Sequence, residues 1–136
     1  MIFQKEIRLN GFARGFHLIT RLIEENLDNL PDKGLLNILV KHTTAALALN
    51  ENADPSVRVD FRSFIDKLIP DNNFDYTHTL EGPDDMSSHL KSSIFGQSLT
   101  IPVSNHQLNL GMWQGIYFCE FRNSGGQRNL VLTVFS

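Results

Sequence analysis

Residues 34–49 alternate apolar and other side chains, a pattern typical of a β-strand with one buried face. Leu36, Ile38 and Val40 lie on one side of this predicted strand, and His42 follows on the same side. Further strands are predicted by alternation or by β-forming residues in residues 2–9, 98–103, 108–122 and 128–135. These strands favour a mostly antiparallel sheet, which strongly limits the folds open to the chain.

Three other segments show the spacing of amphipathic helices. The first runs from Phe16 to Leu30, the second begins at Asp54-Pro55, and the third begins at Asp84 or Asp85 and ends before Gly96. The apolar residues that we expect to be buried are Val57, Phe61, Phe64, Ile65 and Leu68 in the second helix, and Met86, Leu90 and Ile94 in the third. Strands and helices together predict a single α+β domain over residues 1–136.

Composition excludes several classes of partner. The net charge is −3 and Lys and Arg do not cluster along the sequence, so we expect neither nucleic acid nor an anionic membrane as partner. The single cysteine, Cys119, rules out an internal disulfide and favours a cytoplasmic protein. No apolar run reaches the length of a membrane-spanning helix, and Met1 is not followed by a signal-peptide pattern.

Residues 75–89 concentrate titratable side chains, with two histidines and four carboxylates in fifteen positions. Gly82-Pro83 breaks the chain between the histidines, so His78 and His89 cannot share a helix. Asp85 and His89 are four residues apart and are therefore neighbours on the third helix. A carboxylate beside an imidazole fixes its tautomer, as metal and acid–base sites require. The alternative is a helix cap beside a surface histidine.

Two further residues interrupt apolar surroundings. His42 continues the apolar face of its strand, either as a site residue or as a core histidine bonded to backbone. Glu120 lies between Phe118 and Phe121 and requires a partner, which is either a site or an ion pair with Arg122 or Arg128. The three histidines of separate elements, His42, His78 and His89, suit a catalytic zinc site, although their spacing matches no specific metal motif.

Several motifs together resemble the YjbQ family, known as the secondary thiamine-phosphate synthase enzyme family. They are His42-Thr43-Thr44-Ala45-Ala46-Leu47, Asn50-Glu51, Asp54-Pro55, His78, Asp84 to His89 with Lys91, and Gly111-Met112-Trp113-Gln114-Gly115-Ile116 with Glu120. The resemblance covers nearly the whole chain. It implies a β-sandwich-like α+β fold with three helices, a homotrimer, and a pocket lined by histidines.

The resemblance also implies roles for individual residues. His42, His78 and His89 would line the pocket and hold a divalent metal, most readily zinc, or an anion. The supporting polar residues would be Asn50, Glu51, Asp85, Gln114 and Glu120, and in a metal-assisted reaction Glu51 or Glu120 would move protons. The implied activity joins a hydroxymethylpyrimidine diphosphate to a thiazole phosphate.

The sequence therefore leaves three functions open. The first is a metal-assisted enzyme acting on a small phosphorylated molecule. The second is a non-catalytic trimer that binds a metal or ligand, which the lack of a basic phosphate cradle in the sequence favours slightly. The third is an interaction module with a polar core. The sequence contains no Gly-rich phosphate loop, nucleophile elbow or paired-cysteine metal motif.

Overall fold

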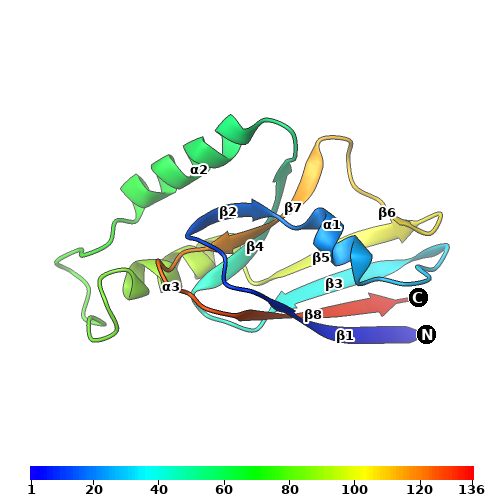
Figure 1. Ribbon diagram of the computed structural model, residues 1–136, viewed down its shortest axis with the longest axis horizontal. Coiled ribbons are helices and arrows are strands. Elements are labelled where there is room, and N and C mark those ends of the chain that lie inside the picture. The colour runs from blue at the N-terminus through cyan, green and yellow to red at the C-terminus, as the bar shows by residue number, and fades with distance from the viewer.

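The computed structural model describes residues 1–136 and contains eight strands and three helices (Figure 1). The elements in chain order are β1 (Ile2–Leu9), β2 (Gly15–Leu18), α1 (Thr20–Glu25), β3 (Lys33–Val40), β4 (Ala45–Glu51), α2 (Pro55–Leu68), α3 (Asp85–Phe95), β5 (Ser98–Ser104), β6 (Gln107–Leu108), β7 (Gln114–Glu120) and β8 (Arg128–Phe135). None of the helices is long and apolar enough to cross a membrane.

The strands form two antiparallel sheets, which confirms the predicted α+β fold. One sheet has the order β1-β8-β3-β5-β6 and the other the order β2-β7-β4. The chain changes sheet at every connection between consecutive strands except β5–β6. One of these changes falls between β3 and β4, so the predicted long strand over residues 34–49 is divided into two. The two termini lie side by side in Figure 1, because β1 pairs with β8 along its whole length.

The main core lies between the two sheets. Alternating residues of β3 and β8, such as Ile38 and Leu132, face Leu47 of β4 and Phe118 of β7 across the sandwich. Ile23 of the short helix α1 packs into the same core. Alternation in the sequence therefore predicted this layer correctly, since period-2 spacing places every second side chain inside.

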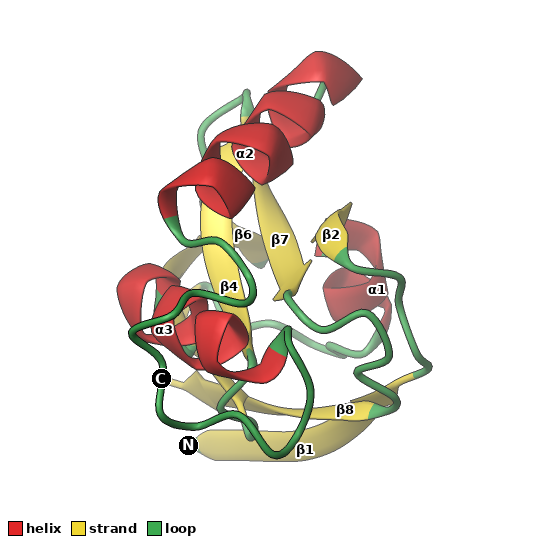
Figure 2. Cartoon of the chain, turned by 90° about the vertical axis from the view of Figure 1, so that its left-hand side faces the viewer, coloured by secondary structure: helices red, strands yellow, loops and turns green.

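Helices α2 and α3 lie outside the three-stranded sheet, as Figure 2 shows. A second apolar cluster fills the space between them and the sheet. It contains Phe16, Ala46, Tyr117, Cys119 and Phe121, with Phe61 of α2 and Phe95 of α3 packed against it. The opposite face of the five-stranded sheet carries no helix (Figure 2), and Leu39 and Phe135 are exposed there.

The prediction of one helix from Phe16 to Leu30 is wrong at both ends. Gly15–Leu18 forms β2, which pairs with β7, and the helix covers only Thr20–Glu25. The reason is tertiary, because the edge of β7 offers backbone hydrogen bonds to this segment and Phe16 enters the second apolar cluster.

The predicted buried face of α3 is also wrong. Ile94 is 64% exposed, whereas the helix buries its polar side, including Ser87, Ser92 and Lys91. Each buried polar group has a partner: Ser87 donates to Asp71, Ser92 donates to the carbonyl of Ala45, and Lys91 pairs with Asp66. Burying polar groups is tolerated only under such pairing.

Helix α2 begins as predicted, with the Asp54 side chain accepting a hydrogen bond from the amide of Ser56. Its expected apolar stripe is only partly covered. Val57, Phe61 and Ile65 are half-buried, but Phe64 and Leu68 are more than 60% exposed. The helix has no fully buried residue, since it covers one edge of the small sheet and nothing covers the helix.

A buried ion pair joins the ends of β7 and β8. Glu120 and Arg128 are bonded through both carboxylate oxygens, at 2.8 and 2.6 Å, and Glu120 is fully buried. Arg128 also donates to the hydroxyl of Thr44. A side chain on Gly125 would overlap the Glu120 carboxylate, which explains the glycine in the connecting turn.

We predict that Glu120→Gln lowers the free energy of unfolding by about 3–5 kcal/mol, because it leaves the Arg128 charge buried without a counter-charge. Urea denaturation followed by circular dichroism measures the change. The double variant Glu120→Gln with Arg128→Met is expected to recover most of the loss. As a control, Lys41→Gln breaks an exposed ion pair with Glu6 and is expected to cost less than about 1 kcal/mol. Equal effects of the two single variants would contradict the prediction.

Candidate metal centre

His78, Asp85 and His89 form a cluster whose ligand atoms all lie within 4.8 Å of one another. Asp85 and His89 stand one turn apart at the start of α3, and His78 reaches them from the loop between α2 and α3. The Asp85 Oδ2 atom lies 2.7 Å from Nε2 of His78 and 3.1 Å from Nε2 of His89. The two imidazole rings therefore flank one carboxylate oxygen.

Asp85 is the fixed member of the cluster. Its carboxylate is 2% exposed, whereas the His78 and His89 side chains are 44% and 31% exposed. The other carboxylate oxygen, Oδ1, accepts a hydrogen bond from the guanidinium of Arg122. Burial raises the pKa of Asp85, but the hydrogen bond from His78 and the charge of Arg122 outweigh it and hold the pKa below its ordinary value.

Asp84 anchors the same arginine. It occupies the N-cap position of α3, yet its side chain makes no cap hydrogen bond. Its Oδ2 instead accepts hydrogen bonds from Arg122 Nε at 3.2 Å and from the Asn123 amide at 2.7 Å. The adjacent carboxylates Asp84 and Asp85 thus hold Arg122 behind the cluster, away from the histidines.

His89 lies between two hydrogen-bond acceptors. Its Nδ1 is 3.1 Å from the carbonyl oxygen of Thr43, and its Nε2 faces the Asp85 carboxylate. A neutral imidazole has only one N–H, and neither oxygen can donate. Donation from Nδ1 to the carbonyl leaves Nε2 facing a carboxylate, and this contact requires either a second proton on the ring or a metal ion at Nε2. Metal-binding histidines commonly have this arrangement.

The donor set fits a divalent transition metal. Two imidazole nitrogens and one carboxylate oxygen match the ligands of catalytic zinc sites that keep an open coordination position. The two histidines are partly exposed, so the open side faces solvent rather than the core. Backbone and arginine contacts to the remaining polar atoms supply the support that metal ligands require.

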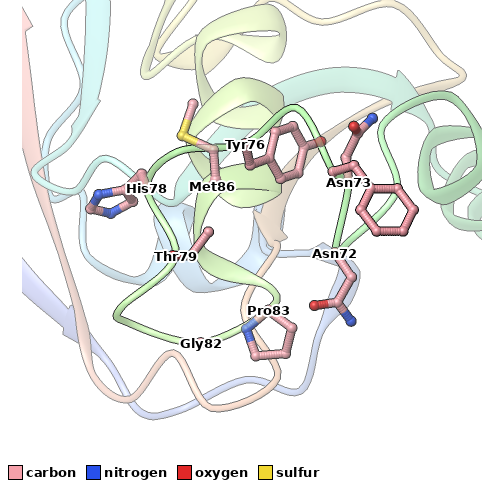
Figure 3. Close-up of a pocket in the computed structure, with 9 residues that line it drawn as sticks. Asn72, Asn73, Tyr76, His78, Thr79, Gly82, Pro83 and Met86 are labelled. Atoms are coloured by element: carbon pink, nitrogen blue, oxygen red, sulfur yellow. The ribbon is translucent and has the colours of Figure 1, made fainter.

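A pocket of about 520 Å³ opens beside His78. It is lined by the loop between α2 and α3 and by the first turn of α3, with His78 at one side and Asn72 and Asn73 at the other (Figure 3). Thr79 and Tyr76 add hydroxyl groups, and the lining contains no Lys or Arg. The pocket therefore offers uncharged hydrogen-bonding groups next to a cluster that can hold a cation.

His42 precedes Thr43, which contacts the cluster, but His42 itself is not part of the cluster. Thr43, the next residue, supplies the carbonyl that faces His89, while His42 Nε2 accepts a hydrogen bond from the Asn129 amide at 2.8 Å. His42 is half-buried, and its bond to backbone matches that part of the alternative that the sequence leaves open. Burial and the charge of Arg128 lower the pKa of His42, so its ring is neutral at pH 7.

The remaining predicted residues lie elsewhere. Asn50 and Glu51 are the last two residues of β4, and Glu51 pairs with Gln114 of β7. The rise of a strand places Glu51 about 20 Å from Ala45, the first residue of β4. These three residues line a separate shallow pocket with Trp113. Glu51 accepts hydrogen bonds from two backbone amides before α2, and Glu120 is bonded to Arg128. Within one chain, the predicted residues therefore form two separate groups, one of His78, Asp85 and His89 and one of Asn50, Glu51 and Gln114. His42 and Glu120 belong to neither group.

Two contributors to the cluster are missed by sequence reasoning. The sequence suggests Arg122 only as an ion-pair partner of Glu120, and Thr43 only as part of a motif. Nothing local marks Arg122 as the partner of Asp85, since 37 residues separate them. The only usable signal is the pair Asp84-Asp85, because two adjacent carboxylates that are buried require a cation as partner.

Comparison with known proteins supports this assignment of the fold. Residues 5–136 match the family described as UPF0047 protein YjbQ-like. The chain is 48% identical to UPF0047 protein YjbQ of Salmonella typhimurium and 46% identical to that of Escherichia coli, with 98% of each chain covered in both comparisons. These relatives carry no stated activity, and the comparisons give no support to thiamine-phosphate synthesis.

Solved structures show the same fold. A conserved hypothetical protein from Thermus thermophilus is 31% identical with a TM-score of 0.83, covering 97% of this chain and 99% of that one. A hypothetical protein from Aeropyrum pernix is 30% identical with a TM-score of 0.82, covering 98% of each chain. A protein of unknown function from Sulfolobus solfataricus, 20% identical, has a TM-score of 0.85 over 100% of this chain and 98% of that one, which shows the fold alone.

We predict that Arg122→Gln makes stability less dependent on acid pH. A carboxylate whose pKa is lowered by folding contributes stability that is present above its unfolded pKa and is lost as the pH falls through the folded pKa. Without Arg122 the pKa values of Asp84 and Asp85 rise, so the variant is less stable at pH 7 and loses less between about pH 5 and pH 3. Urea denaturation at several pH values in this range measures the slope of the free energy of unfolding against pH.

Arg21→Gln is the matched control for the loss of one positive charge, because the Arg21 side chain is 93% exposed and distant in sequence from the cluster. Its slope is expected to equal that of the wild type. An unchanged slope for Arg122→Gln as well would show that Arg122 does not set these pKa values.

Proposed function

This chain belongs to the UPF0047 family of YjbQ-like proteins, which is uncharacterised, and from its site we propose that it binds a divalent metal ion and acts on a small molecule held beside it. His78, Asp85 and His89 would hold the ion. The pocket of residues 72–86 would hold the molecule. Zinc is the metal that this ligand set suits best.

The observation that carries the proposal is the position of His89 between the Thr43 carbonyl and the Asp85 carboxylate. Two acceptors on one imidazole require either two protons on the ring or a metal ion at Nε2. Several features favour the metal. His78 presents a second Nε2 to the same oxygen, and Arg122 already neutralises the other oxygen of Asp85. The side facing the pocket is left open.

A metal ion bound there would supply Lewis-acid chemistry to a carbonyl or phosphoryl oxygen of the bound molecule. The residues of the chain divide the remaining work. Arg122 fixes the orientation of Asp85, the Thr43 carbonyl fixes the ring of His89, and the amides of Asn72 and Asn73 offer hydrogen bonds that orient a polar ligand.

Thiamine-phosphate formation is the finer activity that the family resemblance implies. Departure of diphosphate would gain from a nearby cation, which supports testing this transferase reaction first. The alternative is metal and ligand binding without catalysis, and the lack of Lys or Arg in the pocket beside His78 supports it. Release of diphosphate on mixing the two phosphorylated precursors with the zinc-loaded protein separates the two functions.

We predict that the wild-type protein binds zinc, that His89→Ala abolishes this binding, and that Asp85→Asn weakens it about 10-fold or more. Isothermal titration calorimetry with zinc alone measures these affinities without reference to activity. Circular dichroism checks that each variant is folded, since Asp85 is buried against Arg122.

His106→Ala is the control, because His106 lies in the β5–β6 turn, outside the cluster. Its affinity for zinc is expected to equal that of the wild type. Unchanged zinc binding in both His89→Ala and Asp85→Asn would show that these residues do not bind the metal and only form the start of helix α3. A wild-type protein that takes up no metal would overturn the proposal.

We also propose the homotrimer that the resemblance implies. The exposed apolar residues Phe64 and Leu68 on α2, and Leu39 and Phe135 on the open face of the large sheet, support association of copies. Sedimentation velocity at micromolar concentration is expected to give the mass of three chains, and a monomer would overturn the proposal.

A further inference from the structure

A second hollow, of about 500 Å³, lies between β2 and α2 and is lined by three arginines. Arg58 and Arg62 stand one turn apart on α2, and Arg14 precedes β2. The sequence showed no basic cluster because 44 residues separate Arg14 from Arg58. We call this hollow the arginine groove. It shares no lining residue with the pocket beside His78.

Two of the three arginines are held in place by the protein. Arg14 is bonded to Asp71 at 2.8 Å and to Asp66 at 3.0 Å, and its side chain is only 11% exposed. Arg62 donates to the backbone carbonyl of Arg14 at 3.0 Å and lies 3.7 Å from Asp66. The wall of the groove is therefore fixed before any ligand arrives.

The groove retains excess positive charge. Its lining contains three cations, Arg14, Arg58 and Arg62, and one carboxylate, Asp66; Arg14 is also bonded to Asp71. The lining itself therefore carries an excess of positive charge, although the chain as a whole has a net charge of −3. A local charge opposite to that of the whole protein indicates a site for an anion.

Arg58 identifies where the anion would bind. It takes part in none of the ion pairs of the chain, although it lines the groove. Arg58 and Arg62 are four residues apart on α2, so an anion bound between them would reduce the repulsion of two like charges.

We propose that the arginine groove binds a small phosphorylated anion, with Arg58 and Arg62 contacting the phosphate and Arg14 supporting the charge from behind. Guanidinium groups match phosphate oxygens in pairs of hydrogen bonds. The volume suits a small molecule, and Phe16 gives one apolar wall for an attached organic group. Three arginines in one groove are too few for a nucleic-acid strand, which needs contacts to many phosphates. The groove would bind this anion with or without a metal ion at the candidate metal centre.

The test is isothermal titration calorimetry with inorganic diphosphate as probe, on the full chain without added metal. Wild-type protein is expected to bind it, and Arg58→Gln is expected to weaken binding about 10-fold to 100-fold, as the loss of one charged hydrogen-bonding partner does. The double variant Arg58→Gln with Arg62→Gln is expected to abolish binding. Arg58→Gln removes no hydrogen bond or ion pair of the folded protein, and circular dichroism checks that the variant is folded.

Two controls distinguish binding in this groove from general charge attraction and from binding at the metal centre. Arg21→Gln removes one charge from an exposed site on α1 and is expected to leave the affinity unchanged. His89→Ala alters the metal centre and is also expected to leave diphosphate binding unchanged. Equal weakening by Arg58→Gln and Arg21→Gln would overturn the proposal in favour of general charge attraction. Absence of diphosphate binding, or its loss only in His89→Ala, would also overturn it.

If diphosphate binds as proposed, a phosphate ester and inorganic phosphate compared in the same titration distinguish the sources of the anion. Tighter binding of the phosphate ester than of inorganic phosphate indicates that the organic group packs against the apolar wall at Phe16. Tighter binding of a single-stranded oligonucleotide than of diphosphate would show instead that the groove recognises nucleic acid, and would overturn the assignment to a small molecule.

Discussion

The requirement that every buried polar group has a partner determines how helix α3 is placed. The helix turns Ser87, Ser92 and Lys91 toward the protein, and each of them would be costly to bury alone. Their partners come from other parts of the chain: Asp71 of the loop between α2 and α3, the Ala45 carbonyl of β4, and Asp66 of α2. No buried side-chain nitrogen or oxygen is left without a hydrogen bond. This network, rather than an apolar stripe, fixes the rotation of the helix.

The rotation of α3 in turn sets the geometry of the candidate metal centre. With Ser87 and Lys91 directed inward, Asp85 is buried against Arg122, and His89 projects along the edge of the helix toward the Thr43 carbonyl. His78 completes the cluster because the loop folds back over the start of α3. The site thus combines one rigid, buried carboxylate with two imidazoles that remain open to a ligand, and precise orientation of this kind is what metal binding needs.

Asp66 and Asp71 also connect the two proposed sites. Both carboxylates bond Arg14 at the arginine groove, while Asp66 holds Lys91 and Asp71 accepts from Ser87 on α3. The same pair of carboxylates therefore supports the groove on one side and the helix that carries Asp85 and His89 on the other. The two sites rest on one network of charges, although their lining residues differ.

The sequence alone determined the elements that depend on local periodicity: the alternating strands, the start of α2 at Asp54-Pro55, and Asp85 beside His89 at helical spacing. It could not determine which face of α3 is buried, because the free energy of burying Lys91 depends on Asp66, 25 residues away. Nor could it separate His42 from the other histidines, since the Asn129 amide that bonds its ring is 87 residues distant. The arginine groove likewise exists only once β2 and α2 are packed together. Contacts between residues far apart in sequence decided these features, and local patterns carry no information about them.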